Sequence, residues 1–182
     1  MRNMVAPSNR IADIPEAELS SSQSEVLRKL MAERGRVPTP FKIWLHSPAL
    51  ADHLHDLGNL LTRETSLSKR EAKIAILLIA AHWRAIHVFT MQAREAREAG
   101  LPDVVIDAIS AGDDWTHVRD HTTARECAVY KVVCGLSSLG PVPDAVFDQA
   151  VAALGHRGLA DLLAMCGYFT SVALAMNLYG VV

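Results

Sequence analysis

The sequence is poor in aromatic residues and in cysteine, and it has no large excess of charge of either sign. Aromatic side chains make up 5% of its 182 residues, although hydrophobic residues make up 50%. Alanine and leucine are abundant, and this bias favours helices that pack closely on one another. No stretch alternates apolar and polar residues for long enough to predict a sheet. We therefore expect an all-α protein of about eight helices.

The balance of charge argues against two classes of partner. The formal net charge is -2 at pH 7, which gives no general electrostatic reason to bind nucleic acid or an anionic membrane. The first residues contain no apolar core resembling a signal peptide. We also expect no window to reach the ~18 to 20 uncharged apolar residues that span a bilayer. These patterns predict a cytoplasmic protein without nucleic-acid or membrane partners.

The three cysteines predict neither a disulfide framework nor a zinc site. Cys127, Cys134 and Cys166 are odd in number and widely spaced, and each has apolar neighbours. We interpret them as small buried hydrophobic residues.

The length fits one domain. Residues 1–19 contain two prolines and no helical periodicity, so we expect an irregular N-terminal arm followed by a single domain at 20–182. Caps and apolar spacing predict helical segments over residues 24–35, 41–46, 48–65, 69–81, 86–99, 102–112, 123–140, 144–155 and 158–178.

The stretch from Ser66 to Gly100 is the centre of this organisation. Ser68 and Glu71 have the spacing of a capping box, so a helix should begin near Lys69. Residues 74–81 are apolar on every side, and such a helix is stable only in a core or between subunits. Together with the apolar final helix, this segment exceeds what the core of a small monomer normally absorbs. We therefore expect a homo-oligomer.

The same stretch carries a resemblance to a known family. Leu67-Ser68, the apolar run, His82-Trp83, Ala99-Gly100-Leu101 and the ending GYFTSVALAMNLYGVV resemble the carboxymuconolactone decarboxylase and alkylhydroperoxidase D-like family, from about residue 48 to residue 182. The resemblance implies a multi-helix, all-α subunit that assembles into rings of three, sometimes doubled to six, with a dimer as the alternative.

The positions that carry chemistry in that family differ here. Gln92 stands where the family has its histidine, Val88 where it has a glutamate or its second cysteine, and Ala85 where it has its first cysteine. Lys73 replaces the glutamate of the first helix. Valine and alanine cannot supply a proton or a thiolate, and glutamine does not titrate. We therefore do not expect thiol peroxidase activity, although the family name would suggest it.

Three polar residues remain as catalytic candidates. His87 can exchange a proton near neutral pH, although a hydrogen-bonded core or interface histidine is the alternative. Lys73 can hold an anionic group or act as an amine of depressed pKa, whereas a solvated or glutamate-paired lysine is the alternative. Gln92 can orient a carbonyl or carboxylate, or can simply be a polar surface residue.

We assign His82, Trp83 and Phe89 to substrate binding, although the two aromatic residues are more often core residues. No metal or cofactor is expected. His117 and His121 have i,i+4 spacing beside several aspartates, but an acidic surface loop is far commoner than a ligand set.

Two functional hypotheses follow. The first is a cofactor-independent lyase or isomerase that acts on a small carboxylated or lactone-like metabolite by proton transfer, through decarboxylation, isomerisation or ring opening. The second is a family member without catalysis that serves as a ligand-binding or scaffold protein. We favour the enzyme, because an abandoned cavity should have gained apolar residues at all of these positions.

Overall fold

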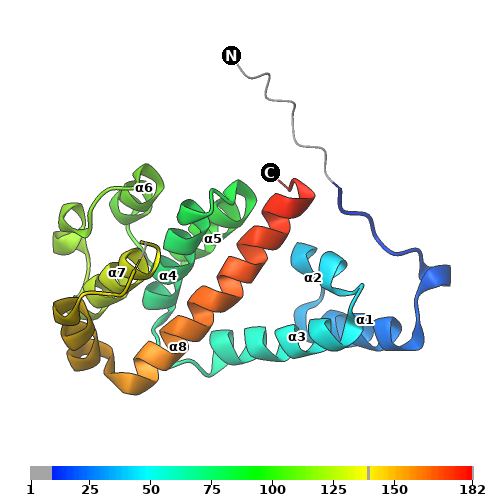
Figure 1. The fold of residues 1–182 in the computed structure, drawn as a ribbon. Helices are drawn as coiled ribbons and strands as arrows, with labels where there is room; N and C mark the ends of the chain where they lie inside the picture. Colours follow the sequence, from blue (N-terminus) through cyan, green and yellow to red (C-terminus); the bar gives the residue numbers. More distant parts are fainter. Residues whose placement is uncertain (1–9, 139, 182) are drawn as a thin grey trace, which may run out of the picture.

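The computed structural model describes residues 10–138 and 140–181, and within these ranges helices are the only regular secondary structure. It has α1 (Ser21–Arg34), α2 (Thr39–Trp44), α3 (Pro48–Arg63), α4 (Lys69–His82), α5 (Ile86–Glu98), α6 (Asp103–Ala111), α7 (Ala124–Leu136) and α8 (Asp144–Tyr179), with three short 3₁₀ turns at Glu16–Glu18, Trp115–His117 and Arg119–His121. Helix α8 runs between two groups of helices, with α4 to α7 on one side and α1 to α3 on the other (Figure 1). The prediction of an all-α fold with about eight helices is confirmed.

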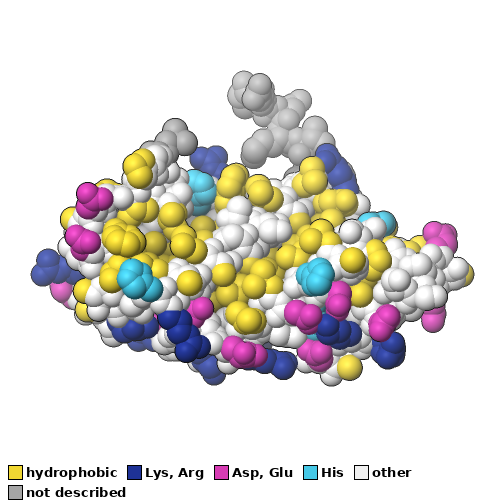
Figure 2. Space-filling view, turned by 60° about the horizontal axis from the view of Figure 1, so that its bottom comes forward, with side chains coloured by type: hydrophobic (Ala, Val, Ile, Leu, Met, Phe, Trp, Pro, Cys, Tyr) yellow, Lys and Arg dark blue, Asp and Glu magenta, His cyan; other side chains and the backbone are white. Residues whose placement is uncertain are grey.

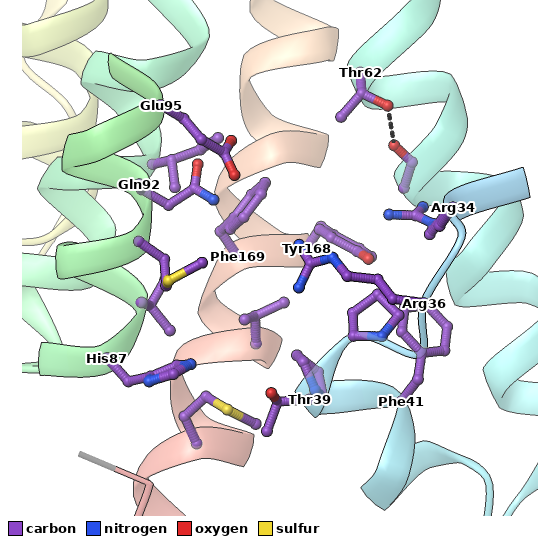
Figure 3. Close-up of a pocket in the computed structure, with 18 of the residues that line it drawn as sticks. Arg34, Arg36, Thr39, Phe41, Thr62, His87, Gln92, Glu95, Tyr168 and Phe169 are labelled. Atoms are coloured by element: carbon purple, nitrogen blue, oxygen red, sulfur yellow. Dashed lines mark hydrogen bonds between the residues drawn. The ribbon is translucent and has the colours of Figure 1, made fainter. Parts of the chain in front are cut away.

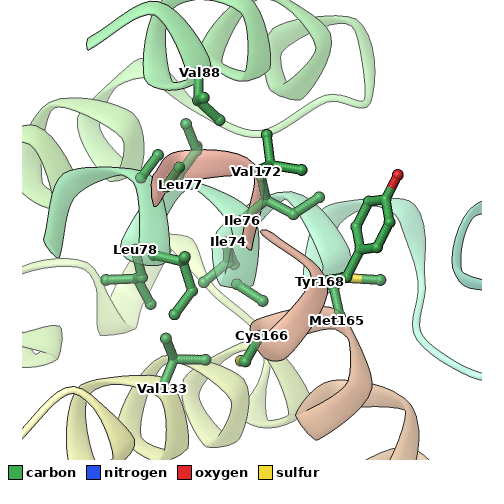
Figure 4. Packing of buried hydrophobic residues seen from close by; sticks show 14 of the residues in the cluster. Ile74, Ile76, Leu77, Leu78, Val88, Val133, Met165, Cys166, Tyr168 and Val172 are labelled. Carbon is green, nitrogen blue, oxygen red and sulfur yellow. The ribbon is translucent and has the colours of Figure 1, made fainter. Parts of the chain in front are cut away.

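Helix α4 is the centre of the larger group. The predicted capping box is present, because Ser68 Oγ accepts from the Glu71 backbone N–H and the Glu71 side chain accepts from the Ser68 backbone N–H. Residues 74–80 are all buried. They pack against α5, α6, α7 and α8, and Figure 4 shows Ile74 and Leu77 among side chains from α7 and α8. A helix without a polar face is accommodated here because other helices surround it.

Helix α8 is bent rather than straight. Gly155 has φ 68° and ψ 172°, which is not a helical conformation, and it separates two helical halves. This break lies where the sequence predicts a gap between two helices.

One expectation about α8 is wrong. The helix contains an 18-residue window with a mean hydropathy of 1.6 and no more than two charged residues, so by length and composition it could cross a membrane. Polar residues such as Thr170 and Ser171 lie within the apolar second half of α8, so a count of purely apolar residues overlooks it. Within the fold, α8 packs against α4 and α7, and the core helix of a soluble bundle passes the same test.

The smaller group, α1 to α3, is joined by polar contacts. Ser20 caps α1, because its hydroxyl forms a capping box with Gln23. Lys29 Nζ of α1 lies 2.7 Å from both Asp52 Oδ1 and Asp56 Oδ1 of α3. These contacts hold α1 along α3. The expected arm falls partly outside the described residues, since nothing is placed before residue 10.

Candidate functional site

A pocket of about 230 Å³ lies where the two groups of helices meet at α8. One stripe of α5 lines it with His87, Val88, Met91, Gln92 and Glu95. Their spacing of one, three, one and three residues places them along a single face of the helix. The opposite side comes from the end of α1, the α1–α2 loop, α2 and α3, as Figure 3 shows.

Lys73, His87 and Gln92, the three predicted catalytic residues, all line this pocket. Lys73 Nζ donates to Gln92 Oε1 at 2.7 Å and to the Glu95 carboxylate. Lys73 is therefore paired with a glutamate, which is the alternative that the sequence left open for this residue. The Gln92 amide is oriented by this contact: its oxygen is engaged by Lys73, and its N–H groups remain for the pocket.

His87 is half-buried and lies on the same wall, towards the lower edge of the pocket in Figure 3. No hydrogen bond to its ring joins it to another residue in the described ranges. A half-buried imidazole without a protein partner is available to a bound molecule.

The remaining lining is mostly apolar. Ile76 of α4 and Phe169, Val172 and Met176 of α8 form its inner surface. Such a surface excludes water around a ligand and strengthens the electrostatic contacts made there.

Sequence reasoning missed three polar residues on the far wall, Arg34, Arg36 and Tyr168. They are distant in sequence from α5, and the segment holding Arg36 shows only as a break between helices. One signal pointed to this wall, namely Gly58 in the middle of α3. A Cβ at Gly58 would lie 2.7 Å from the Tyr168 hydroxyl oxygen, so this glycine is needed for the close packing of α3 against α8.

The three residues assigned to substrate binding, His82, Trp83 and Phe89, do not line this pocket. Phe89 follows His87 by two residues, about 200° around the helix, and packs against the hydrophobic core. His82 and Trp83 are exposed at the end of α4 and contact each other edge to face, with ring centroids 5.2 Å apart. The Trp83 carbonyl accepts a hydrogen bond from Asn177 Nδ2 at 2.7 Å.

A turn through Arg84, with φ 50°, separates the end of α4 from the pocket-lining stripe of α5. His82 and Trp83 lie on the α4 side of this turn and do not line the pocket. Their assignment to substrate binding, like that of Phe89, finds no support in the lining of the pocket.

None of the three cysteines lines the pocket. Cys166 is buried, and burial raises the pKa of its thiol to about 11. Cys134, in contrast to the expectation, is exposed, and Cys127 is half-buried. In the ranges that the structure covers, no group of three or more His, Cys, Asp or Glu side chains is placed to hold a metal ion.

Comparison with known proteins supports the fold of this chain but gives no information about its chemistry. No family model matches the chain, and no curated protein matches it. Among solved structures, the chain is similar to an uncharacterized peroxidase-related protein from Silicibacter sp. TM1040. The TM-score is 0.74 at 14% identity, over 96% of this chain and 92% of that one. A likeness at this identity shows the fold alone. The chain therefore has the all-α, alkylhydroperoxidase D-like fold of a peroxidase-related protein.

Proposed function

We propose that this protein is a cofactor-independent enzyme that binds a small carboxylated or lactone-like metabolite and transforms it by proton transfer. The observation that carries the proposal is the meeting of Lys73, His87 and Gln92 in one largely apolar pocket. They come from two helices, and each side chain reaches the same space. An apolar enclosure with a few convergent polar groups is the usual form of a small-molecule site.

The contacts distribute the roles among the three residues. Decarboxylation, isomerisation and ring opening each place negative charge on an oxygen of the substrate, and an aligned N–H donor stabilises that charge. The Gln92 amide is the donor, because Lys73 holds its oxygen and leaves its N–H groups for the substrate. Lys73 keeps the amide oriented while Glu95 balances its charge. Lys73 therefore acts as a positioning residue rather than as a free amine.

His87 supplies and removes the proton. In a decarboxylation the bond to the carboxylate carbon breaks, carbon dioxide leaves, and the electron pair passes into an enolate whose oxygen Gln92 stabilises. Protonated His87 then delivers its proton to the carbon. In an isomerisation the neutral imidazole removes a proton from one carbon and returns it to another. Both sequences balance without a redox partner.

A ligand-binding protein without catalysis is the second candidate. The pairing of Lys73 with Glu95 favours it, because the cation is already neutralised within the protein. Thiol peroxidase activity is disfavoured for this chain, because no cysteine reaches the pocket and the buried Cys166 thiol resists ionisation.

A substrate screen with two variants tests the proposal. The purified protein is incubated with lactones, muconate-like acids and β-keto acids, with hydroperoxides as the contrasting class. We expect turnover in the first three classes, and we expect His87→Ala to lower kcat by roughly 100-fold or more, as loss of a general acid–base residue does. Joint replacement of Cys127, Cys134 and Cys166 by alanine should leave kcat largely intact.

The outcomes separate the candidates. Hydroperoxide reduction that requires thiol and disappears in the cysteine-free protein would identify a peroxidase. Full turnover by His87→Ala would remove His87 from the mechanism. Binding of these acids without any turnover would identify the ligand-binding protein.

A further inference from the structure

We propose that Arg34, Arg36 and Tyr168 form an anion subsite that holds the carboxylate group of a ligand whose apolar body lies along α8 towards His87. The inference deepens the proposed function and rests on it, because it names the chemical group that the same pocket recognises. It concerns a wall of the pocket that the proton-transfer roles do not use.

Arg36 supplies the first donor. Its side chain extends from the α1–α2 loop into the middle of the pocket, as Figure 3 shows. Among residues 10–138 and 140–181, it forms no ion pair or hydrogen bond. A guanidinium group presents several N–H donors in one plane, a geometry that matches the two oxygens of a carboxylate. Arg36 is therefore a charged donor set without an acceptor, placed at the space that a ligand would fill.

Arg34 supplies a second guanidinium, and this one is held in place. Its Nε donates to His55 Nδ1 at 3.2 Å, and its Nη2 donates to Asn59 Oδ1 at 3.0 Å. The group also lies 5.8 Å from the centroid of the Phe41 ring. These three neighbours are neutral, because a histidine that accepts at Nδ1 carries its proton on Nε2. The contacts therefore fix the orientation of Arg34 without cancelling its charge.

The Glu33 carboxylate contacts His55 and Asn59, the two side chains to which Arg34 donates. Glu33 Oε2 lies 3.0 Å from His55 Nε2 and accepts from Asn59 Nδ2 at 2.7 Å. Glu33 thereby sets the proton on Nε2 of fully buried His55 and leaves Nδ1 to accept from Arg34. The chain from Glu33 through His55 to Arg34 is a positioning device for the subsite.

Tyr168 completes the wall. Its ring packs edge to face with Phe169 and tilted against Trp44, at centroid distances of 5.3 and 6.1 Å. The residue is 9% exposed, and its hydroxyl has no hydrogen-bond partner in the described part of the chain. The hydroxyl oxygen itself keeps access to solvent in the pocket, so its O–H is free to donate to an acceptor that enters. A carboxylate oxygen beside Arg34 would be such an acceptor.

Gly58 makes room for both polar ends. A Cβ at this position would lie 2.7 Å from the Tyr168 hydroxyl and 3.1 Å from Arg34 Nη2. Glycine weakens a helix interior, so its presence in α3 is explained by the space that these two groups occupy. Figure 3 shows the Tyr168 hydroxyl directed towards the two arginines.

The charges of the lining agree with an anionic ligand. Three cations, Arg34, Arg36 and Lys73, line the pocket with a single carboxylate, Glu95. Glu95 is already paired with Lys73, so both guanidinium charges remain without a carboxylate in contact. The apolar residues between the two walls receive the rest of the ligand.

Paired probes test this subsite while the substrate is still unidentified. Titration calorimetry of the full chain compares benzoate with benzamide and hexanoate with hexanamide, which differ in charge but little in shape. We expect each carboxylate to bind at least tenfold more tightly than its amide. Arg36→Gln should weaken carboxylate binding at least tenfold, equivalent to about 1.4 kcal/mol, and leave amide binding unchanged. Tyr168→Phe should weaken it about threefold by removing one hydrogen bond.

Arg94→Gln is the matched control, because Arg94 lies on α5 outside the pocket with its side chain 79% exposed. It should bind the carboxylates as the parent protein does. Arg36 is itself exposed, so its replacement should leave the melting temperature unchanged. Equal affinities for the carboxylates and their amides, unchanged carboxylate binding in Arg36→Gln, or no carboxylate binding at millimolar concentration would each overturn the subsite.

His87→Ala separates this inference from the proposed function. It should bind benzoate normally while losing turnover. A parent protein that turns over no substrate, yet binds carboxylates through Arg36, would refute the enzyme and support the subsite. Turnover that is insensitive to Arg36→Gln in both kcat and KM, together with unchanged benzoate affinity, would support the enzyme and refute the subsite.

Discussion

The Glu71 carboxylate connects three helices. Its two oxygens accept from Arg125 Nε at 2.8 Å and Arg125 Nη2 at 3.1 Å, which joins α4 to α7. Arg125 Nη1 also donates to the Ala153 carbonyl of α8 at 2.8 Å. Burial acts to raise the pKa of Glu71, but the Arg125 side chain and the Ser68 backbone N–H outweigh it and lower that pKa below 4.5. The ionised form is therefore the one that the folded protein stabilises.

We predict that Glu71 makes the stability of the protein depend on pH in the acid range. A carboxyl whose pKa is depressed on folding contributes stability above its unfolded pKa, and that stability is lost as pH falls through the folded pKa. Glu71→Gln should lower the free energy of unfolding by about 1 to 3 kcal/mol at neutral pH. The difference from the parent should shrink below pH ~4. Urea unfolding at several pH values measures both effects.

Glu98→Gln is the control for this prediction, since the Glu98 side chain is 64% exposed and pairs with Arg94 on the surface. It should change the unfolding free energy by less than about 0.5 kcal/mol. A constant gap between Glu71→Gln and the parent from neutral to acid pH would show that the contact acts through packing and not through charge.

At the same scale, the sequence identifies one wall of the pocket and misses the other. Lys73, His87 and Gln92 can be found together because they lie in one motif whose spacing is fixed by two adjacent helices. Arg34 and Tyr168 lie far apart in the sequence, and only the packing of α1 on α3 and of α3 on α8 brings both to the pocket. A pattern of local spacing carries no information about such a meeting.

The bend in α8 depends on the backbone conformation of one residue, Gly155. Gly155, with φ 68° and ψ 172°, occupies a region that side chains strongly disfavour. Sequence reasoning places a break here because GHRG interrupts the apolar pattern. It cannot give the angle between the two halves, because that angle depends on how α8 crosses α4 and α7.

We predict that Gly155→Ala destabilises the protein, although alanine is the better helix former. The strain at this φ and ψ should cost about 1 to 3 kcal/mol. Gly167, also in α8, lies within regular helix, and a methyl group added to its Cα would meet no atom within 4 Å. Gly167→Ala should therefore stabilise the protein by up to about 1 kcal/mol. Thermal unfolding of the two variants measures the opposite signs, and a rise in melting temperature for both would contradict the bend.

The helix boundaries can be predicted where their cause is local, and not where it depends on tertiary packing. Capping boxes at Ser68 and Thr123 and left-handed glycines at Gly35 and Gly112 occur where the sequence places helix ends. These signals are local and need no partner helix. The position of His82 and Trp83 outside the pocket depends on the turn at Arg84, and the direction of that turn cannot be read from spacing.

The whole molecule presents apolar surface that its own core does not cover. Hydrophobic side chains gather across the middle of the face that Figure 2 shows. On α8, Leu163, Leu174 and Leu178 are 52%, 44% and 68% exposed. Their spacing of eleven and four residues places them along one stripe of the helix. Exposed stripes of this kind are typical of contacts between subunits.

We predict that this stripe forms part of a homo-oligomer, with a trimer, a hexamer or a dimer as the candidate assemblies. Light scattering at micromolar concentration should give a mass above that of one chain. Leu163→Glu together with Leu174→Glu should reduce it, because two buried charges without partners oppose association. Met31→Glu on α1, where Met31 is 50% exposed, serves as the control. A folded monomer of the parent protein would contradict the assembly.

The pocket lies on the line where α1 to α3 meet the rest of the chain at α8. A molecule bound there would contact both groups of helices and would add to the packing that already holds them together. It would bind only the folded protein, and at a concentration 100 times its Kd it would add about 2.7 kcal/mol to the free energy of unfolding. The melting temperature therefore becomes an assay for ligands. A library of small acids can be ranked by the rise in melting temperature that each acid causes, before the reaction is known.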